Sequence, residues 1–440
     1  MDERVRLVVL DDDPTGIQTV HGCLLFTRWD TRTLRAGFED EAGFFYVLTN
    51  TRAYDRSRAR RIVREVLHNV LELNREYGYP LIFVSRSDST LRSHFPTEID
   101  VIRQAVEAEE SRPLDAVFMV PAFFEGGRLT VGDTHYVEEE GVRIAADQTE
   151  YARDSVFGYH NAHLPSYIQE KTAGRVDAGT VESISLDLLR GDPDELKDFL
   201  RGLSDSCFVV VNAERYEDLD AFSEALLAVA AEGKLFAFQS AASVVKTLAG
   251  LPDKPLLGAE IAHHDGNGLF VVGSHVRKTT DQIGELLRQP NVRGIEADVR
   301  RILNDGESML RETARQMQDA WGSEQTPAVY TSREELTFDS KDERLEAGQR
   351  ISTFLASLVR QIGGPLPYLV AKGGITSHDV LMHGLQVARA EVLGQILPGV
   401  PVIEAPEGNR FEGMPYVIFP GNVGDNRALV DVYETLDAGA

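Results

Sequence analysis

The chain has 440 residues, the length of two or three ordinary domains. It carries 45 Lys and Arg against 70 Asp and Glu, a formal net charge of −25, and 42% of its residues are hydrophobic. The apolar share is sufficient for large cores. The acidic balance argues against a protein that binds nucleic acid or an anionic membrane over a wide surface. An anionic ligand would need a local electropositive site.

Cysteines and long apolar segments are scarce. Cys23 and Cys207 lie far apart, so neither a disulfide framework nor a cysteine-based zinc site is expected. The apolar run at 5–10 is too short for a signal peptide, and no stretch approaches the roughly 18 apolar residues of a membrane helix. We therefore expect a cytoplasmic protein.

A pattern recurs along the N-terminal half: a short apolar run, then a polar or glycine-rich turn, then an amphipathic segment. Residues 58–77, for example, have apolar side chains at helical spacing. Short apolar runs separated by helical stretches are typical of buried parallel strands in βα units. The runs are residues 6–10, 43–48, 80–84, 116–120, 207–211 and 235–238.

Two segments interrupt the pattern. Residues 135–180 are polar, with several histidines and tyrosines, and indicate an insertion or lid. Residues 250–267 are rich in Pro, Gly and polar side chains, as at a domain boundary, and the pattern restarts after them. We therefore predict two α/β, Rossmann-like domains, residues 1–250 and 265–440, with mainly parallel sheets and a cleft between them.

The turn at residues 11–16 (DDDPTG) directly follows the first predicted strand. Ligands of open parallel sheets bind beyond the carboxyl ends of the strands. Three adjacent carboxylates repel one another unless a cation or a hydroxyl lies near, and an arginine, Mg²⁺ or a sugar would serve. The alternative is a solvated turn in which Asp13 caps a helix that begins at Pro14.

Two later turns of the N-terminal half carry arginines. Arg86, Asp88 and Arg92 follow a strand, and together they suit a small polyhydroxy acid, because arginine matches carboxylates and aspartate accepts from hydroxyls. The alternative is a structural Arg–Asp pair. Arg128 follows the flexible pair at 126–127 and could reach a ligand, although a plain loop explains it equally well.

Three glycine turns follow strands in the C-terminal half, at 273–274, 373–377 and 421–425. Backbone N–H groups at helix starts bind phosphate when glycines let it approach, so an acidic protein can hold a nucleotide without many cations. The chain has no GxxxxGK[ST] loop and no GxGxxG after its first strand. Two histidine pairs, 160/163 and 263/264, lack the pattern of a metal site, so no metal ligands are predicted.

The first strand and turn also fit hhhhDxDxT, which is similar to the first motif of haloacid-dehalogenase-type phosphatases. Such a Mg²⁺-dependent phosphatase would use Asp11 as nucleophile and Asp13 as acid/base, with Thr49 as its second motif. The lysine and closing acid that it also needs are found only at Lys372 and Asp425, in the other predicted domain. The phosphatase stays open as an alternative.

Over its whole length the sequence resembles the four-carbon acid sugar kinase family, once described as a domain of unknown function. Seven motifs occur in the family's order, nearly from end to end. They are DDDPTG (11–16), SRSDSTLR (85–92), PAFFEGGRLTVGDTHYV (121–137), VVGSHVRKTTDQI (271–283), AKGGITSHDV (371–380), LPGVPV (397–402) and PGNVGD (420–425).

The resemblance implies an ATP-dependent kinase of acids such as erythronate, threonate or their 3-oxo forms. It also implies an N-terminal substrate domain and a C-terminal nucleotide domain. The implied ATP contacts are Ser274, Gly373, Gly374, Ile375, Thr376 and Gly399. The implied substrate contacts are Asp11, Asp12 and Thr15 of the first turn, and Arg86, Asp88 and Arg92.

Two motifs depart from the family's pattern. Relatives usually have glycine after the arginine of STLR, where this chain has Ser93 and His94. The last motif commonly reads K-x-G-x-F-G, and residues 419–424 lack that lysine. The substrate is therefore open, as is a non-catalytic relative that only binds nucleotide or sugar acid. Other sources of the missing charge are Lys372, Arg277 and Lys278.

The mechanistic hypothesis places the ATP phosphates on the glycine turns, including Gly421 and Gly424, with Mg²⁺ bridging the phosphates. Arg86 and Arg92 would hold the substrate carboxylate, with Arg128 as a further contact. The expected partners are the sugar acid and ATP, not nucleic acid or membrane, and a homo-oligomer is left open.

The general base is assigned to the aspartates of the substrate turns. Asp12 or Asp88 would orient the attacking hydroxyl and accept its proton, and Asp12 is favoured. Closure of the two domains would exclude water from the reaction.

Overall fold

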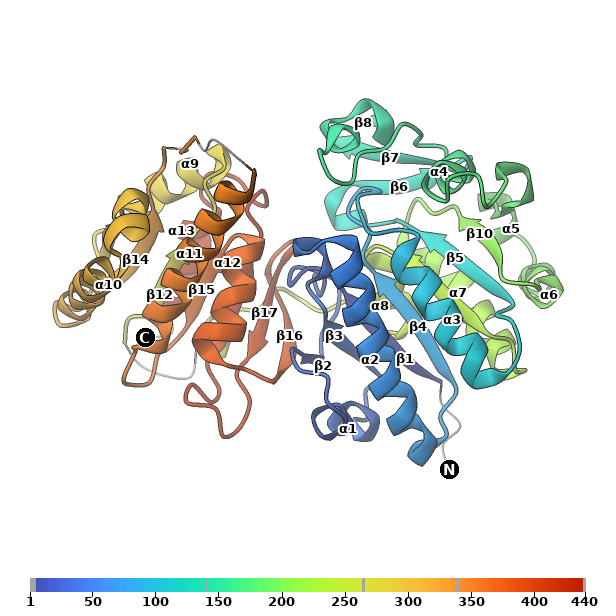
Figure 1. The fold of residues 1–440 in the computed structure, drawn as a ribbon, viewed down its shortest axis with the longest axis horizontal. Helices are drawn as coiled ribbons and strands as arrows, with labels where there is room; N and C mark the ends of the chain where they lie inside the picture. The colour runs from blue at the N-terminus through green and yellow to red at the C-terminus, as the bar shows by residue number, and fades with distance from the viewer. Residues whose placement is uncertain (1–4, 140, 263–265, 335, 338–340, 438–440) are drawn as a thin grey trace. The chain divides into compact units, whose positions relative to one another are not determined.

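The computed structural model describes residues 5–139, 141–262, 266–334, 336–337 and 341–437. The chain divides into two compact units, Met1–Asp253 (unit 1) and Lys254–Ala440 (unit 2). Both units are α/β, with helices packed on mainly parallel strands (Figure 1). This confirms the predicted fold class, while the cleft between the domains stays a prediction.

The main sheet of unit 1 is parallel throughout its described pairings, in the order β2-β3-β1-β4-β11-β5-β10-β9. The predicted apolar runs form its central strands, because a strand buried on both faces needs apolar side chains on both. The strands are β1 (Arg6–Asp11), β2 (Cys23–Phe26), β3 (Phe44–Leu48), β4 (Leu81–Arg86), β5 (Ala116–Val120), β9 (Glu182–Ile184), β10 (Cys207–Val211) and β11 (Phe236–Ser240).

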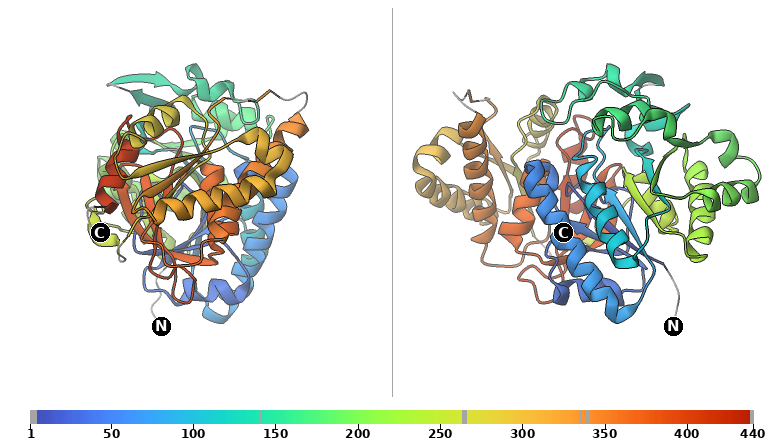
Figure 2. Two further views of the ribbon diagram at one scale, coloured as in Figure 1. Left: turned by 90° about the vertical axis from the view of Figure 1, so that its left-hand side faces the viewer. Right: turned by 45° about the vertical axis from the view of Figure 1, so that its right-hand side comes forward.

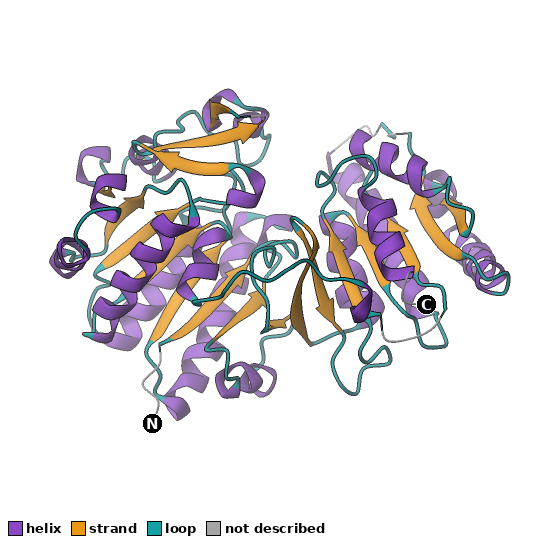
Figure 3. Ribbon diagram, turned by 180° about the vertical axis from the view of Figure 1, so that it is seen from behind, coloured by secondary structure: helices purple, strands orange, loops and turns teal. Residues whose placement is uncertain are grey.

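Helices cover both faces of this sheet, with α2 and α3 on one and α7 on the other (Figures 1 and 3). The predicted helix at 58–77 is α2, which begins after Asp55, whose carboxylate caps the first turn, and ends at Gly78 with φ 70°. The helices are α1 (Thr31–Glu39), α2 (Arg56–Tyr77), α3 (Thr97–Glu110), α4 (Leu164–Lys171), α5 (Leu186–Leu189), α6 (Pro193–Gly202), α7 (Tyr216–Ala231) and α8 (Ser243–Leu248).

The interrupted segment of unit 1 forms a separate antiparallel sheet, β6-β7-β8, which lies beyond the carboxyl ends of the parallel strands (Figures 1 and 2). Its strands are β6 (Arg128–Val131), β7 (Thr134–Glu139) and β8 (Val142–Ala145). Two short 3-10 helices follow, η3 (Ala146–Gln148) and η4 (Glu150–Arg153). This insertion therefore starts at Arg128, slightly before the predicted break.

The sheet of unit 2 has the order β13-β14-β12-β15-β18-β17-β16. The first five strands pair in parallel, whereas β16 and β17 form an antiparallel hairpin against β18. The strands are β12 (Leu269–Val272), β13 (Val292–Ala297), β14 (Thr326–Thr331), β15 (Leu369–Lys372), β16 (Arg389–Leu397), β17 (Val400–Glu404) and β18 (Pro415–Phe419). The helices are α9 (Arg277–Leu286), α10 (Val299–Trp321), α11 (Lys341–Arg360), α12 (Gly374–Asp379) and α13 (Ala428–Asp437), and a π-helix (Val380–Leu385) follows α12.

Each unit has its own hydrophobic core. In unit 1 the core includes Phe45, Val66 and Ile102, and in unit 2 it includes Val370 and Leu429. Among the described residues, no helix combines the length and the apolar character needed to cross a membrane.

Candidate functional site

Three turns of unit 1 meet because β3, β1 and β4 are neighbours in the sheet. Asp11, the last residue of β1, lies opposite Leu48 of β3 and Arg86 of β4. The carboxyl ends of these strands therefore bring the 11–16 turn, the 3-10 helix η1 (Thr51–Ala53) and the 86–92 turn together. The 11–16 and 86–92 turns, which the sequence singled out separately, therefore lie next to each other.

Asp11 and Arg86 form a buried ion pair at the base of the site. Arg86 Nε lies 3.1 Å from Asp11 Oδ1, and the residues are 4% and 0% exposed. Burial raises the pKa of Asp11 to about 7, although Arg86 opposes the shift. A Cβ at Gly16 would overlap both Asp11 Oδ1 and Arg86 Nε, so only glycine fits there. This pair is packed into the protein rather than presented to a ligand.

Asp12 is held by Arg52, a residue that the sequence analysis did not single out. Arg52 donates to both carboxylate oxygens of Asp12, from Nε at 2.9 Å and from Nη2 at 2.7 Å. Burial raises the pKa of Asp12 and the arginine opposes this. Arg52 lies in the turn after β3, which ends at Leu48, so its position soon after an apolar run was a usable signal. The two oxygens of Asp12 are thus already engaged.

Asp13 accepts from Thr15 through the backbone N–H at 2.8 Å and through Oγ1 at 2.5 Å. Its carboxylate also lies 3.5 Å from Arg52 Nη1, and these contacts lower its pKa despite its desolvation. The alternative of a wholly solvated turn is wrong, because the first two aspartates are buried. The predicted helix cap is wrong as well, because residues 12–19 form turns and no helix begins at Pro14; Asp13 closes a local turn by accepting from Thr15.

Asp88 has a different environment from these three. Its Oδ1 accepts from Leu91 N at 3.0 Å, and its Oδ2 has no partner in the described part of the chain although the residue is only 3% exposed. Burial raises its pKa to about 6, against the opposing charges of Arg52 and Arg86. The loop around it is strained, since Thr90 and Leu91 have φ of 54° and 62°.

Arg92 and Arg128 approach each other around Tyr151 of η4. The guanidinium carbons lie 4.7 Å and 5.3 Å from the centre of the tyrosine ring. Arg128 Nη2 also donates to Tyr151 Oη at 3.0 Å. Arg128 Nε donates to Thr90 Oγ1 at 3.3 Å, which links β6 to the strained loop.

The three glycine turns of unit 2 also gather, because β12, β15 and β18 are neighbours. A Cβ at Gly373 would lie 3.2 Å from Ser274 Cβ, and one at Gly421 would lie 2.9 Å from Ser274 Oγ. Gly373 has φ 114°, a backbone conformation that favours glycine. Thr279 of α9 braces the group by donating to Gly421 O at 2.9 Å.

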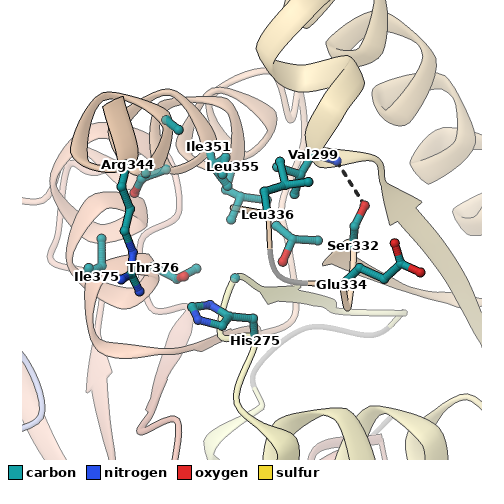
Figure 4. A pocket seen from close by; sticks show the side chains of 15 residues that line it. His275, Val299, Ser332, Glu334, Leu336, Arg344, Ile351, Leu355, Ile375 and Thr376 are labelled. Carbon is teal, nitrogen blue, oxygen red and sulfur yellow. Dashed lines mark hydrogen bonds between the residues drawn. The ribbon is translucent and has the colours of Figure 1, made fainter. Parts of the chain in front are cut away.

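A pocket of about 210 Å³ opens beside these turns (Figure 4). Gly273, Ile375 and Thr376 line it near the glycine turns, and Ile351 and Leu355 of α11 line its apolar wall. Ile375 is 68% exposed, unusual for a large apolar side chain. The recess lies beside the first turn of α12, whose leading backbone N–H groups precede the first intrahelical bond, from Ser377 N to Gly373 O. An apolar recess next to such N–H groups has the character of a nucleotide site.

Two predicted nucleotide contacts lie apart from this pocket. Gly399 occupies the turn of the β16–β17 hairpin, where its N–H donates to Gln395 Oε1 at 2.6 Å. Gly424, with φ 80°, packs on Ala428 at the start of α13. Of the eight predicted nucleotide contacts, only Ile375 and Thr376 line the pocket, and the roles assigned to all eight stay predictions.

Lys372 lies beneath the last glycine turn, where the sequence lacks the family's lysine. It is fully buried, and its Nζ donates to Pro420 O at 2.8 Å and lies 3.8 Å from the centre of the Phe419 ring. Burial, with a smaller effect of Lys278, lowers its pKa to about 7. Lys278 Nζ itself donates to Asn422 O at 3.3 Å.

The described residues contain no group of three or more His, Cys, Asp or Glu side chains that could hold a metal ion. His160 contacts Glu170 and His163 contacts Ser166, whereas His263 and His264 lie outside the described residues.

Two family models match the chain. The model of a sugar-binding N-terminal domain matches residues 7–248, more than half of the chain, and that of a nucleotide-binding C-terminal domain matches residues 269–429. No curated protein gives a significant match.

Solved structures share the fold. A Salmonella typhimurium LT2 protein, provisionally described as a tRNA synthase, aligns with a TM-score of 0.70 at 17% identity, over 97% of this chain and 98% of its own. Haemophilus influenzae protein HI1011, of the DUF1537 family, aligns with a TM-score of 0.65 at 16% identity, over 98% of this chain and 100% of its own.

Proposed function

Because the chain belongs to the four-carbon acid sugar kinase family, we propose that it transfers a phosphoryl group from ATP to a hydroxyl of a small sugar acid. Acids of the threonate, erythronate or 3-oxo-tetronate type are the proposed substrates. Unit 1 binds the acid and unit 2 binds the nucleotide in this proposal. Direct transfer needs the reacting atoms about 3–3.5 Å apart, so the predicted cleft between the domains belongs to the proposal.

The observation that carries the proposal is the carboxylate of Asp88. One of its oxygens is buried without a partner, its pKa is raised to about 6, and Arg92 lies near enough to oppose that shift. A buried acceptor with a pKa below neutrality can take a proton from a hydroxyl as that hydroxyl attacks. A nearby arginine supplies the charge that recognises a carboxylate.

We assign the general base to Asp88 rather than to Asp12, which the sequence favoured. Both oxygens of Asp12 accept from Arg52, so proton transfer to Asp12 would break a buried bidentate pair. Asp12 then positions Arg52, whose charge acts on Asp88. By the same argument Arg86 is engaged by Asp11 and stabilises the turn. We therefore assign binding of the substrate carboxylate to Arg92 and Arg128.

In unit 2 the residues present fit a nucleotide. The first turn of α12, beside Ser274, Gly373 and Gly421, would hold the phosphates through the backbone N–H groups that precede its first intrahelical bond, from Ser377 N to Gly373 O. The recess at Ile375 would take the base. Bound ATP with Mg²⁺ supplies the phosphoryl group and neutralises its charge. Lys372 supports the last turn from below and adds positive charge near it when protonated.

The phosphatase alternative receives little support from the geometry of its motif. Its nucleophile would be Asp11, which is fully buried under Gly16 and paired with Arg86. Thr49 Oγ1 donates to the backbone carbonyl of Asp11 at 2.9 Å, a structural bond.

One assay separates the three functions. The full-length protein is incubated with Mg-ATP and a panel of four-carbon acids, and ADP is followed. ADP release that depends on the acid supports the kinase. Phosphate release from a phosphomonoester without ATP supports the phosphatase, and nucleotide binding without turnover over the whole panel supports a non-catalytic relative.

A further inference from the structure

The arginines of unit 1 fall into two classes by their partners. Arg52 and Arg86 each pair with a buried aspartate of the first turn. In the described part of the chain, Arg128 has no carboxylate within 4.0 Å, and Arg92 has only Asp154, at 3.6 Å. The charge of the first pair is therefore compensated within the protein, while Arg92 and Arg128 retain positive charge for a bound anion.

Two neighbouring guanidinium groups repel each other, and the single carboxylate of Asp154 offsets only part of their charge, so a further contact must hold them together. Tyr151 does this through its ring, 4.7 Å from Arg92 Cζ and 5.3 Å from Arg128 Cζ, and through its hydroxyl, which accepts from Arg128. The negative face of an aromatic ring attracts cations, by about 0.5–2 kcal/mol each. Both arginines thus converge on one side chain.

The remaining contacts fix the direction of each arginine: Arg128 donates to Thr90 Oγ1 and to the carbonyl of Gly126. Arg92 donates to Ser89 through Nε at 3.0 Å and through Nη2 at 3.1 Å, which leaves Nη1 directed toward the carboxylate of Asp154. Tyr151 and Asp154 both come from the insertion, whereas Ser89 and Arg92 come from the turn after β4. The insertion therefore determines how the turn presents its positive charge.

We propose that Tyr151 is a positioning residue that holds Arg92 and Arg128 as a pair for the substrate's carboxylate, and so makes unit 1 prefer a sugar acid to an uncharged sugar. This inference rests on the proposed function. It adds Tyr151 as a determinant of specificity, and this residue of the insertion lies outside all seven sequence motifs.

The test compares Tyr151→Leu, which removes ring and hydroxyl, with Tyr151→Phe, which keeps the ring. For Tyr151→Leu we expect kcat/KM for the best four-carbon acid to fall about 3- to 30-fold, the range that a cation–π contact corresponds to. The loss lies in KM for the acid, and KM for ATP is unchanged. Tyr151→Phe retains most of the activity, since the ring still faces both arginines.

A comparison with an uncharged ligand of the same size identifies the carboxylate as the group that the arginines bind. The inhibition constant of the uncharged four-carbon polyol is measured against the wild type and both variants, and it should not change. The matched control is Tyr79→Leu, which removes a ring stacked on Arg6 at the same 4.7 Å but at the amino end of β1. That variant should keep the KM for the acid.

The results separate the two proposals. Titration of the acid without ATP reports binding alone. If the wild type binds no acid and releases no ADP, the proposed function fails. If the wild type is active and Tyr151→Leu keeps its KM for the acid, or weakens acid and polyol equally, the positioning role is overturned.

Discussion

Four aspartates lie at the carboxyl ends of β1 and β4, and their chemical properties differ because their hydrogen-bond and ion-pair partners differ. Asp12 is engaged by Arg52, Asp13 by Thr15, and Asp11 lies against Arg86 under a glycine. Asp88 keeps a buried oxygen without a partner. Burial and pairing thus give the four carboxylates different environments, and the proposed function assigns the acid/base role to the one with a free oxygen.

Asp88→Asn should reduce turnover by at least 100-fold while ATP binding stays unchanged, because an amide cannot accept the proton. The wild-type kcat/KM should rise with pH through about 6, since Asp88 must be deprotonated to act and its pKa is raised to about 6. A pH profile of kcat/KM for the acid checks this.

Asp11→Asn is the control, because burial also raises the pKa of Asp11, to about 7. It should leave the acid limb of the profile in place. If the limb instead disappears in this variant and Asp88→Asn retains activity, Asp11 is the titrating group and the assignment of Asp88 is wrong.

Gly16→Ala should destabilise unit 1 by about 1–3 kcal/mol, the usual cost of overpacking, because its Cβ would overlap Asp11 and Arg86. Urea unfolding measures the change. Gly202→Ala is the matched control, since a Cβ there meets nothing within 4 Å. Equal stabilities for the two variants would contradict the packing argument.

At the residue scale the sequence predicted the positions near strand ends and missed their partners. Asp11, Arg86 and Asp88 follow apolar runs, so their place at the edge of the sheet could be read directly. That Asp12 pairs with Arg52, 40 positions away, depends on the order in which β3, β1 and β4 lie side by side. Tyr151 lies in the insertion, where no periodic pattern indicates which side chains face the arginines.

The glycine turns act as a set because their strands are adjacent. Gly373→Ala should lower the affinity for ATP, by about tenfold if strain and crowding together cost 1–2 kcal/mol, because φ is 114° and Ser274 lies close. Binding of the acid should not change. Nucleotide titration of this variant and of Gly363→Ala, where a Cβ meets nothing within 4 Å, measures the effect.

Wild-type affinity for ATP in Gly373→Ala would show that phosphate does not approach this turn. An equal loss of ATP affinity in the Gly363→Ala control would mean that the substitutions disturb unit 2 in general rather than the phosphate site.

At the scale of elements the βα pattern predicted the parallel strands but not the β16–β17 hairpin. Apolar runs in these strands are compatible with either direction of pairing, and strand direction depends on the connection to the next element. The short turn around Gly399 makes the hairpin antiparallel. The same Gly399 was expected at the nucleotide, which illustrates that a glycine in a motif can serve a turn.

For the molecule as a whole, Lys372 should make stability depend on pH. Its folded pKa of about 7 lies below the unfolded value of 10.5, so between these values the unfolded chain binds more protons and stability rises with pH. Below pH 7 the full cost of burying the charge is present. Lys372→Met should remove this rise, and denaturant unfolding of the full chain from pH 7 to 10 checks it. A wild-type rise that persists in the variant would contradict the burial of a titrating lysine.

The net charge of −25 is compatible with two anionic ligands because each unit builds its own local site. In the proposed function, unit 1 uses Arg92 and Arg128, which have one carboxylate partner between them, Asp154, and unit 2 uses backbone N–H groups at the start of α12. The fold class and both groups of turns were predictable, since they follow from local patterns. The sequence could not show which charged groups stay available to a ligand, because this depends on ion pairs between residues far apart in the chain.

The most direct test is phosphorus NMR of the full-length protein with Mg-ATP and each four-carbon acid. We predict, for at least one acid, a new phosphomonoester signal that grows in step with ADP and is absent with Asp88→Asn. Inorganic phosphate as the only product beside ADP, or no acid-dependent signal over the whole panel, would contradict the proposed transfer.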